Sequence, residues 1–294
     1  MKLKILFLSL FISFKVFALV DYSETVSSPE EKNPVNNSYT KMNKVSNSSQ
    51  SNSRSLTWKA DYSLSTNYES LEISGEKFGV MNVGFHLQTP FNVFFDASYW
   101  HAQGQLDSSS GNPKMIIGFN WLRFGNPSEE ARLDFYGGAK LATDSRLGSS
   151  RFDKIVGVET TKRFGSFGLG IGYDLSLVGL PKDEFEKSIG NISRIVFSGG
   201  WMVSNDIQFE VEVENFTISP DKSSNRTNHL SEKVQFSTLS PKLNLGLAQA
   251  VNLEFGARFR IKKAKEEANL MNARVFELHG ANANSLFAGL NFTI

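Results

Sequence analysis

The sequence predicts an all-β fold: a closed antiparallel up-and-down transmembrane β-barrel of about 12 strands over residues 57–294. Three observations support this prediction. Apolar residues alternate with polar or small residues in segments of about ten. Short and long connections between these segments alternate along the chain. No stretch after residue 20 is long enough and apolar enough to form a membrane-spanning helix.

The alternation is clearest in residues 166–180, SFGLGIGYDLSLVGL, where Phe, Leu, Ile and Tyr take every second place and Gly, Asp and Ser fill the gaps. A soluble sheet would cover its second face with charged or bulky polar groups. In a membrane barrel the apolar face contacts lipid and the bare face lines the interior. In chain order, the alternating segments are 58–64, 81–87, 93–99, 115–121, 133–141, 156–158 (the weakest), 167–177, 195–203, 207–213, 243–247, 251–259 and 286–294.

The connections predict an up-and-down meander whose tight turns share one end. Short connections lie near 89–90, 125–130, 164–166, 204–206 and 248–250, and long polar ones near 68–77, 102–113, 143–151, 179–191, 218–232 and 262–282. Because lipid offers no hydrogen-bond partners, such a sheet must close and lose its edges. A soluble β-sandwich or lectin-like domain is the alternative, but it would not explain the alternating loop lengths.

Aromatic residues gather near the segment ends, where they suit the membrane–water boundary. They are Trp58, Trp121, Phe164, Phe167, Trp201 and Phe292 at the short-turn end, and Tyr99 and Trp100 at the other end.

With these features, residues 57–294 resemble the Gram-negative outer-membrane β-barrel proteins, a porin-like class. The terminus SLFAGLNFTI resembles their C-terminal assembly signal, although the chain ends in Ile294 where the family usually has an aromatic residue. The resemblance implies a bacterial outer-membrane location, periplasmic short turns and external long loops. It also implies contact with outer-membrane lipid and lipopolysaccharide, and recognition of the last strand by the barrel-assembly machinery.

The N-terminal region predicts export. Lys2 and Lys4 precede an apolar run, and Val16-Phe17-Ala18 fits a cleavage site, so residues 1–18 are predicted to be a signal peptide. An uncleaved membrane anchor is the alternative. Residues 19–56 are rich in Ser, Asn and Lys and predict a disordered periplasmic tether.

Composition excludes several kinds of site. There is no cysteine, so neither a disulfide framework nor a thiolate metal site can form. The formal charge is only +1, which argues against a nucleic-acid partner bound by charge alone. No His or carboxylate pair has metal-ligand spacing, and we expect no cofactor and no metal. His86 stands alone in its segment and is expected to be a hydrogen-bonded residue of the interior wall.

The inward positions predict a charged interior. The expected pore-lining residues are Lys59, Asp61, Asp134, Lys140, Asp174, Arg194, Glu210, Glu212, Glu214, Glu254, Arg258 and Arg260. The carboxylate row at 210–214 and the arginines at 258 and 260 would create a transverse field acting on permeating solutes. The alternative is a salt-bridge network that fills the interior.

Glycines at inward positions predict a smooth part of the inner wall. They are Gly138, Gly168, Gly170, Gly172 and Gly200. Such glycines can also merely relieve strand curvature. The space beside them could hold water and solute, the 19–56 tether, or the 262–282 loop. In that loop Ala264, Ala268, Met271, Val275 and Leu278 share one helical face, although an extended strand top is the alternative.

Two further motifs remain. His229 and Ser231 have the spacing of a His-x-Ser pair, which outer-membrane lipid hydrolases carry, with Asn215 as a weak third candidate; an ordinary polar loop is the alternative. Pro241, together with an apolar phase that switches between Phe236 and Leu243, predicts a bulge in the tenth strand.

The sequence therefore supports three hypotheses. The first is a passive outer-membrane channel for small polar solutes. The second is a non-conducting barrel that serves as a surface-binding module or structural anchor. The third is a lipid hydrolase with Ser231 as nucleophile.

Overall fold

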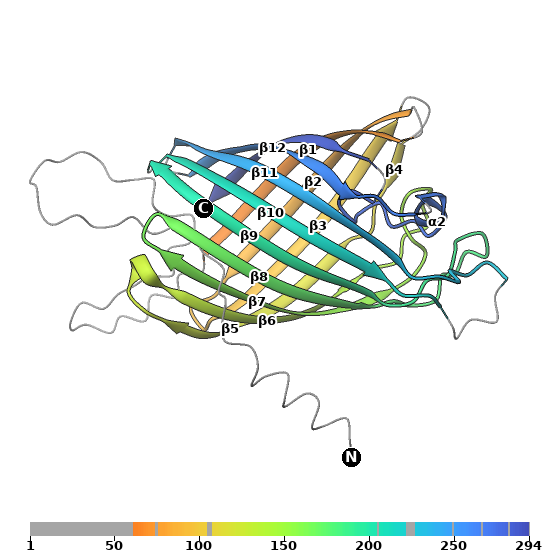
Figure 1. Ribbon diagram of the computed structural model, residues 1–294, viewed down its shortest axis with the longest axis horizontal. Helices are drawn as coiled ribbons and strands as arrows, with labels where there is room; N and C mark the ends of the chain where they lie inside the picture. The colour runs from red at the N-terminus through yellow and green to blue at the C-terminus, as the bar shows by residue number, and fades with distance from the viewer. Residues whose placement is uncertain are drawn as a thin grey trace, which may run out of the picture.

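A computed structural model describes residues 61–293, apart from 74–75, 105–107, 205, 222–226, 249, 266 and 282 (Figure 1). The predicted signal peptide, the predicted tether, Lys59 and Ile294 lie outside the described residues. No helix in the described part of the chain is long and apolar enough to cross a membrane.

The described residues form one antiparallel sheet that closes on itself. Its long strands are β1 (Asp61–Ile73), β2 (Glu76–Gln88), β3 (Val93–Gly104), β5 (Lys114–Phe124), β6 (Ala131–Lys140), β7 (Asp153–Phe164), β8 (Phe167–Leu177), β9 (Ile192–Ser204), β10 (Ile207–Ile218), β11 (Val234–Ala248), β12 (Val251–Lys262) and β13 (Ser285–Thr293). Each long strand pairs with its neighbours in the chain, and β1 pairs with β13, with Leu64 opposite Phe292. The predicted closed barrel of 12 strands is confirmed.

Three short elements complete the fold. They are β4 (Ser108–Ser110), the 3-10 helix η1 (Pro127–Glu129) and the helix α2 (Glu267–Asn272). The short turns lie at the left-hand end of Figure 1, and α2 and most long connections lie at the right-hand end. Below, these are called the short-turn end and the long-loop end.

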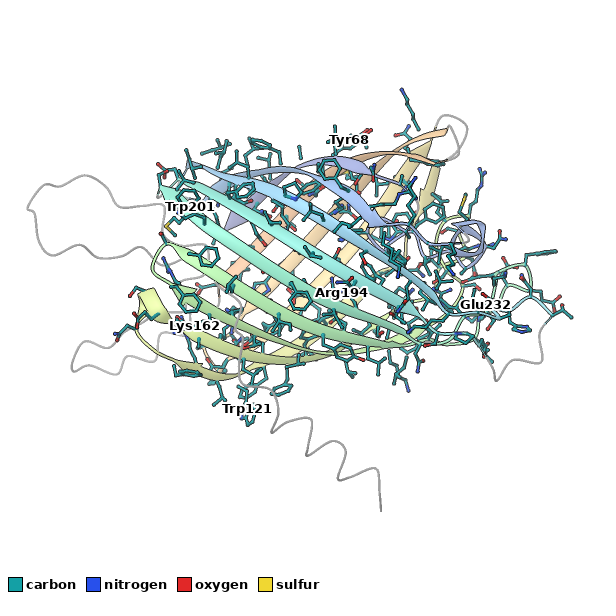
Figure 2. The ribbon with its side chains drawn as sticks, in the orientation of Figure 1. Tyr68, Trp121, Lys162, Arg194, Trp201 and Glu232 are labelled. Atoms are coloured by element: carbon teal, nitrogen blue, oxygen red, sulfur yellow. The ribbon has the colours of Figure 1, made fainter. Side chains whose placement is uncertain are left out.

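Side-chain exposure follows the predicted period of two. In β8, Phe167, Leu169 and Tyr173 are exposed, whereas the intervening Gly168 and Gly170 are buried. Trp121 and Trp201 point away from the barrel, with exposed fractions of 53% and 55% (Figure 2). An apolar outer face suits lipid, because the hydrocarbon offers side chains no hydrogen-bond partners.

Trp100 departs from the predicted aromatic boundary. It lies on the inward face of β3 with an exposed fraction of 7%, in an apolar cluster with Ala102 and Leu147. Its neighbour Tyr99 is 40% exposed, as expected for the outer face. Adjacent strand residues face opposite sides, so only one of the two could contact the membrane.

The predicted long loop at 68–77 is wrong. β1 and β2 continue as a hairpin in which Ile73 lies opposite Glu76, so the connection is short. Residues 68–77 do not alternate regularly between apolar and polar side chains, and for this reason the sequence indicated a loop. An apolar face is needed only where a strand contacts lipid, and hydrogen bonding between strands can continue beyond it.

The predicted bulge in the tenth strand lies at Ser237 and Thr238 of β11 and not at Pro241. β10 and β11 pair without a register shift from Ile207 to Ile218, with Val211 opposite Pro241. The irregularities of β11 lie on its β12 side, between Ser237 and Thr238 and between Gly246 and Ala248. The apolar residues change phase along β11 because Val234 and Phe236 point inward, into an apolar cluster at the long-loop end.

Candidate functional site

The candidate site is the barrel interior, which contains two cavities. The lower cavity, of about 410 Å³, lies near the short-turn end. Its polar and charged lining residues are Asp61, Ser63, His86, Gln88, Asp96, Asn120, Arg132, Asp134, Glu159, Asn291 and Thr293. All of them lie on strands, so the pleat of the barrel wall sets their direction.

The upper cavity, of about 390 Å³, lies nearer the long-loop end. Its charged lining residues and histidine are Glu69, Lys114, Lys140, Asp153, Asp174, Arg194, Glu214, Arg258, Glu277 and His279. Glu277 and His279 belong to the connection between β12 and β13, residues 263–284, which we call the last loop. A loop from the barrel end therefore contributes to the interior wall.

An ion-pair chain centred on Arg194 crosses three neighbouring strands. Arg194 of β9 donates to Asp174 of β8 and, at 2.8 Å, to Glu214 Oε1 of β10. The Tyr136 hydroxyl also donates to Asp174, and His279 Nδ1 lies 3.1 Å from Glu214 Oε2. Figure 2 places Arg194 about midway along the barrel. These bonds satisfy the buried carboxylate of Glu214 and connect the wall to the last loop.

The carboxylate row of β10 has partners that the sequence did not identify. Lys242 Nζ of β11 lies 2.9 Å from Glu212 Oε2 and 3.5 Å from Glu210 Oε1. Arg258, expected to face this row, instead pairs with Glu69 of β1 and lies 4.6 Å from the Phe287 ring centre. Lys242 could have been found from its parity, because Leu243 was already assigned outward.

The remaining predicted wall residues are distributed along the barrel. Asp134 accepts from Asn120 at 2.8 Å and lies 2.7 Å from Arg132 Nε in the lower cavity. Lys140 Nζ lies 2.6 Å from both Asp153 and Glu277 in the upper cavity. Two others, Glu254 and Arg260, lie on β12, where Glu254 is opposite Asn244 of β11. Neither of these two side chains lines the upper or the lower cavity.

His86 fulfils its expected role as a hydrogen-bonded wall residue. Its Nδ1 lies 2.6 Å from Asp96 Oδ1 of the neighbouring strand, and both side chains line the lower cavity.

The glycines predicted to form a smooth inner wall lie on β6, β8 and β9, and only part of that wall is bare. Gly168, Gly170, Gly172 and Gly200 are buried in β8 and β9, with Gly168 opposite Gly200. A Cβ at Gly172 would meet no atom closer than 3.7 Å. Gly138 instead allows close approach, because a Cβ there would clash with the Met115 carbonyl of β5. The wall at β7 is covered too, since the Tyr136 ring lies over Gly157.

An apolar cluster fills the long-loop end among the described residues. We call it the apolar cap, and it comprises Ile189, Ile192, Phe216, Ile218, Leu230, Val234, Phe236, Ala264, Leu270, Ala273, Val275 and Ala281. The Phe216 and Phe236 rings stack with centres 4.8 Å apart. Three long connections and the ends of three strands, β9, β10 and β11, thus share one core.

The last loop is helical over only part of the predicted stretch. α2 ends at Asn272, and Arg274 has a positive φ of 47°. Ala264 and Val275 nevertheless lie in the apolar cap, and Leu278 contacts it. Beyond α2 the chain turns into the upper cavity, which Phe276 and Gly280 help to line. Gly280 has a φ of 72°, and a Cβ there would clash with Thr238 of β11.

The His229, Ser231 and Asn215 side chains are not joined into a hydrogen-bonded triad. Asn215 Oδ1 accepts from Ser237 at 2.6 Å, and in the described part of the chain Ser231 has no hydrogen-bond partner and is exposed. His229 forms an isolated backbone bridge with Ser188. The described residues also contain no group of three or more His, Cys, Asp or Glu side chains that could hold a metal ion.

We therefore expect Ser231→Ala to leave any lipid release by the purified protein unchanged. A serine nucleophile needs an adjacent base to accept its proton, and this geometry does not supply one. Release of fatty acid from phospholipid or lipid A vesicles would be measured for the wild type and the variant. Release by the wild type that disappears in Ser231→Ala would contradict this expectation.

No protein-family model and no curated protein matches the sequence. Among solved structures, an outer membrane channel from Pseudomonas putida F1 is similar, with a TM-score of 0.55, 9% identity, and coverage of 81% of this chain and 96% of that chain. The NanC porin has a TM-score of 0.49 and 10% identity, covering 78% of this chain and 98% of that chain. The likeness to the P. putida channel concerns the fold, and it agrees with the predicted closed antiparallel β-barrel.

Proposed function

We propose that the protein is a passive outer-membrane channel for small polar solutes. The observation that supports this most directly is the polar, charged interior of a closed barrel, with unfilled space of about 410 and 390 Å³ toward its two ends. A basic side chain facing lipid would cost roughly 2–4 kcal/mol near the midplane, whereas a hydrated lumen accommodates it. Passive diffusion along such a lumen needs no cofactor.

The last loop is proposed to form the constriction of this channel. Glu277 and His279 hold it against two separate parts of the wall, at Lys140 of β6 and Glu214 of β10. Loop residues that enter a lumen reduce its open cross-section and present their own charges to solutes. The expected selectivity residues of β10 then act together with Glu277 and Lys140.

Planar bilayer recording tests the channel directly. The purified, refolded full chain is expected to produce discrete single-channel current steps in 1 M KCl. A heat-dependent shift in gel mobility checks that the barrel has folded before recording. Folded protein that inserts into bilayers but gives no current steps would overturn the channel proposal.

The apolar cap favours a second candidate function. It joins three long connections into one packed core at the long-loop end, where Ile218, Leu230 and Val275 are almost fully buried. A barrel closed in this way would act as a surface-binding module or structural anchor. If this second function holds, the folded protein will insert into bilayers without producing current steps.

The same proposal assigns roles to the chain ends. Residues 1–18 would direct export and residues 19–56 would form a periplasmic tether. β13 pairs with both β12 and β1, so its placement closes the barrel. That position supports recognition of β13 by the barrel-assembly machinery, and the exposed outer aromatics support contact with outer-membrane lipid and lipopolysaccharide.

A further inference from the structure

We propose that the channel selects small cations over anions, and that the wall of the lower cavity provides most of this selectivity. The proposal rests on the proposed channel function and names the class of solute that passes. It follows from the balance of charges along the whole interior, compared between its two cavities and the strands beside them.

The lower cavity has an excess of carboxylates. Asp61, Asp96, Asp134 and Glu159 line it, and among the described residues Arg132 is its single arginine or lysine. Arg132 already pairs with Asp134 at 2.7 Å. A narrow space with an excess of one sign of charge, within low-dielectric walls, concentrates counter-ions. This cavity therefore attracts cations and repels anions.

Glu159 is an uncompensated carboxylate in the strand wall of the lower cavity. In the described part of the chain it has no hydrogen bond or ion pair, and the charged groups that influence it are Arg132, Asp134, Arg194 and Glu212. Its neighbour in register on β8 is Gly172. A Cβ at Gly172 would lie 3.9 Å from Glu159 Cγ, so the bare glycine leaves space beside the carboxylate.

The strands beyond the lower cavity show the same sign of imbalance. Glu210 and Glu212 share one cation, Lys242, and Glu254 adds a third carboxylate whose charge acts on both Glu210 and Lys242. A cation leaving the lower cavity along this wall thus continues to meet more negative than positive groups.

The upper cavity is close to balanced and serves as the internal comparison. Arg194, Arg258 and Lys140 each pair with carboxylates across its wall. Lys114 adds a further cation that forms no ion pair within the described residues. Because positive and negative groups nearly cancel here, this part of the interior contributes less to charge selection.

The test is the reversal potential of the full-length protein in planar bilayers across a tenfold KCl gradient. We expect a permeability ratio of K⁺ to Cl⁻ above one for the wild type. Glu159→Gln is expected to lower the ratio by about twofold or more, because it removes one charge from a confined space. Glu159→Asp, which retains the charge, should preserve the ratio. Lys114→Gln, a change of opposite sign in the upper cavity, should not lower it.

The outcomes separate the two proposals. Folded wild-type protein without current steps overturns the channel, and the selectivity with it. Current steps with a permeability ratio at or below one overturn the selectivity alone. A ratio that is equally high in the wild type and in Glu159→Gln overturns the role of the lower cavity. The heat-dependent gel shift, recorded for each variant, shows that a changed ratio does not come from misfolded protein.

Discussion

Shortening the last loop is expected to raise single-channel conductance at least about twofold, because the constriction is formed by chain that enters the lumen. The change replaces residues 274–281 with a four-residue Gly-Ser linker. It removes Phe276, Glu277 and His279 from the upper cavity wall while leaving α2 in place. Single-channel recording in 1 M KCl measures the effect.

A milder change separates the constriction from the packing of the cap. The double variant Glu277→Gln/His279→Gln weakens the contacts with Lys140 and Glu214 and keeps the loop length and Gly280. We expect more frequent transitions between current levels, because the loop is held less firmly. Phe185→Ala is the control, since this side chain is 87% exposed and lines neither cavity. Unchanged conductance in the folded, shortened variant would refute a constriction by the last loop.

The outer face of the barrel was predictable because lipid imposes one requirement on every strand. Each strand must present apolar side chains at every second position, so the phase of β8 follows from Phe167 and Leu169 alone. The residues between the lipid-facing positions must then point inward. For this reason Asp134, Asp174 and Arg194 could be predicted as inward residues before any strand pairing was known.

The partners of these inward residues could not be predicted in the same way. Arg258 and Glu69 are 189 positions apart, and they meet only because β12 and β1 flank β13 in the closed sheet. Pairing across a barrel depends on curvature and shear as well as on strand order. The closest cation of the β10 carboxylates was missed for this reason, since Lys242 lies on β11, between β10 and β12.

The apolar cap escaped prediction because its residues imitate lipid-facing ones. Phe216, Ile218, Val234 and Phe236 continue β10 and β11 with apolar side chains in the inward phase. Period-two patterning tells which residues share a face and does not tell whether that face meets lipid or a folded loop. The inward position of Lys140, by contrast, indicates a carboxylate partner, because a lysine is almost never fully buried unless it is paired.

Replacing Arg151 is expected to cause the largest loss of stability at the long-loop end. Arg151 is fully buried; it donates to Glu186 Oε1 at 2.9 Å and to the Ala273 carbonyl at 2.6 Å, and its Nε lies 3.3 Å from Asp153. Arg151→Ala would leave the buried carboxylate of Glu186 without its closest cation, whereas Asp153 would keep Lys140. Breaking such a pair costs about 3–5 kcal/mol. Arg151 also connects the loop that follows β6 to the loop that precedes β13, so its loss should loosen the apolar cap.

Limited proteolysis and urea unfolding in detergent micelles together locate this effect. We expect Arg151→Ala to speed cleavage within 141–152, 178–191 and 263–284 by at least about tenfold, because local opening then requires less free energy. The strands should remain protected, since Arg151 lies outside them. Lys182→Ala removes an exposed cation from the same end and should leave the cleavage rate near that of the wild type. Equal cleavage rates for the two variants would mean that the buried Arg151 cluster does not hold the cap together. Arg151→Lys should recover only part of the protection, because an ammonium group cannot reach the Glu186 and Ala273 oxygens with the planar geometry of a guanidinium.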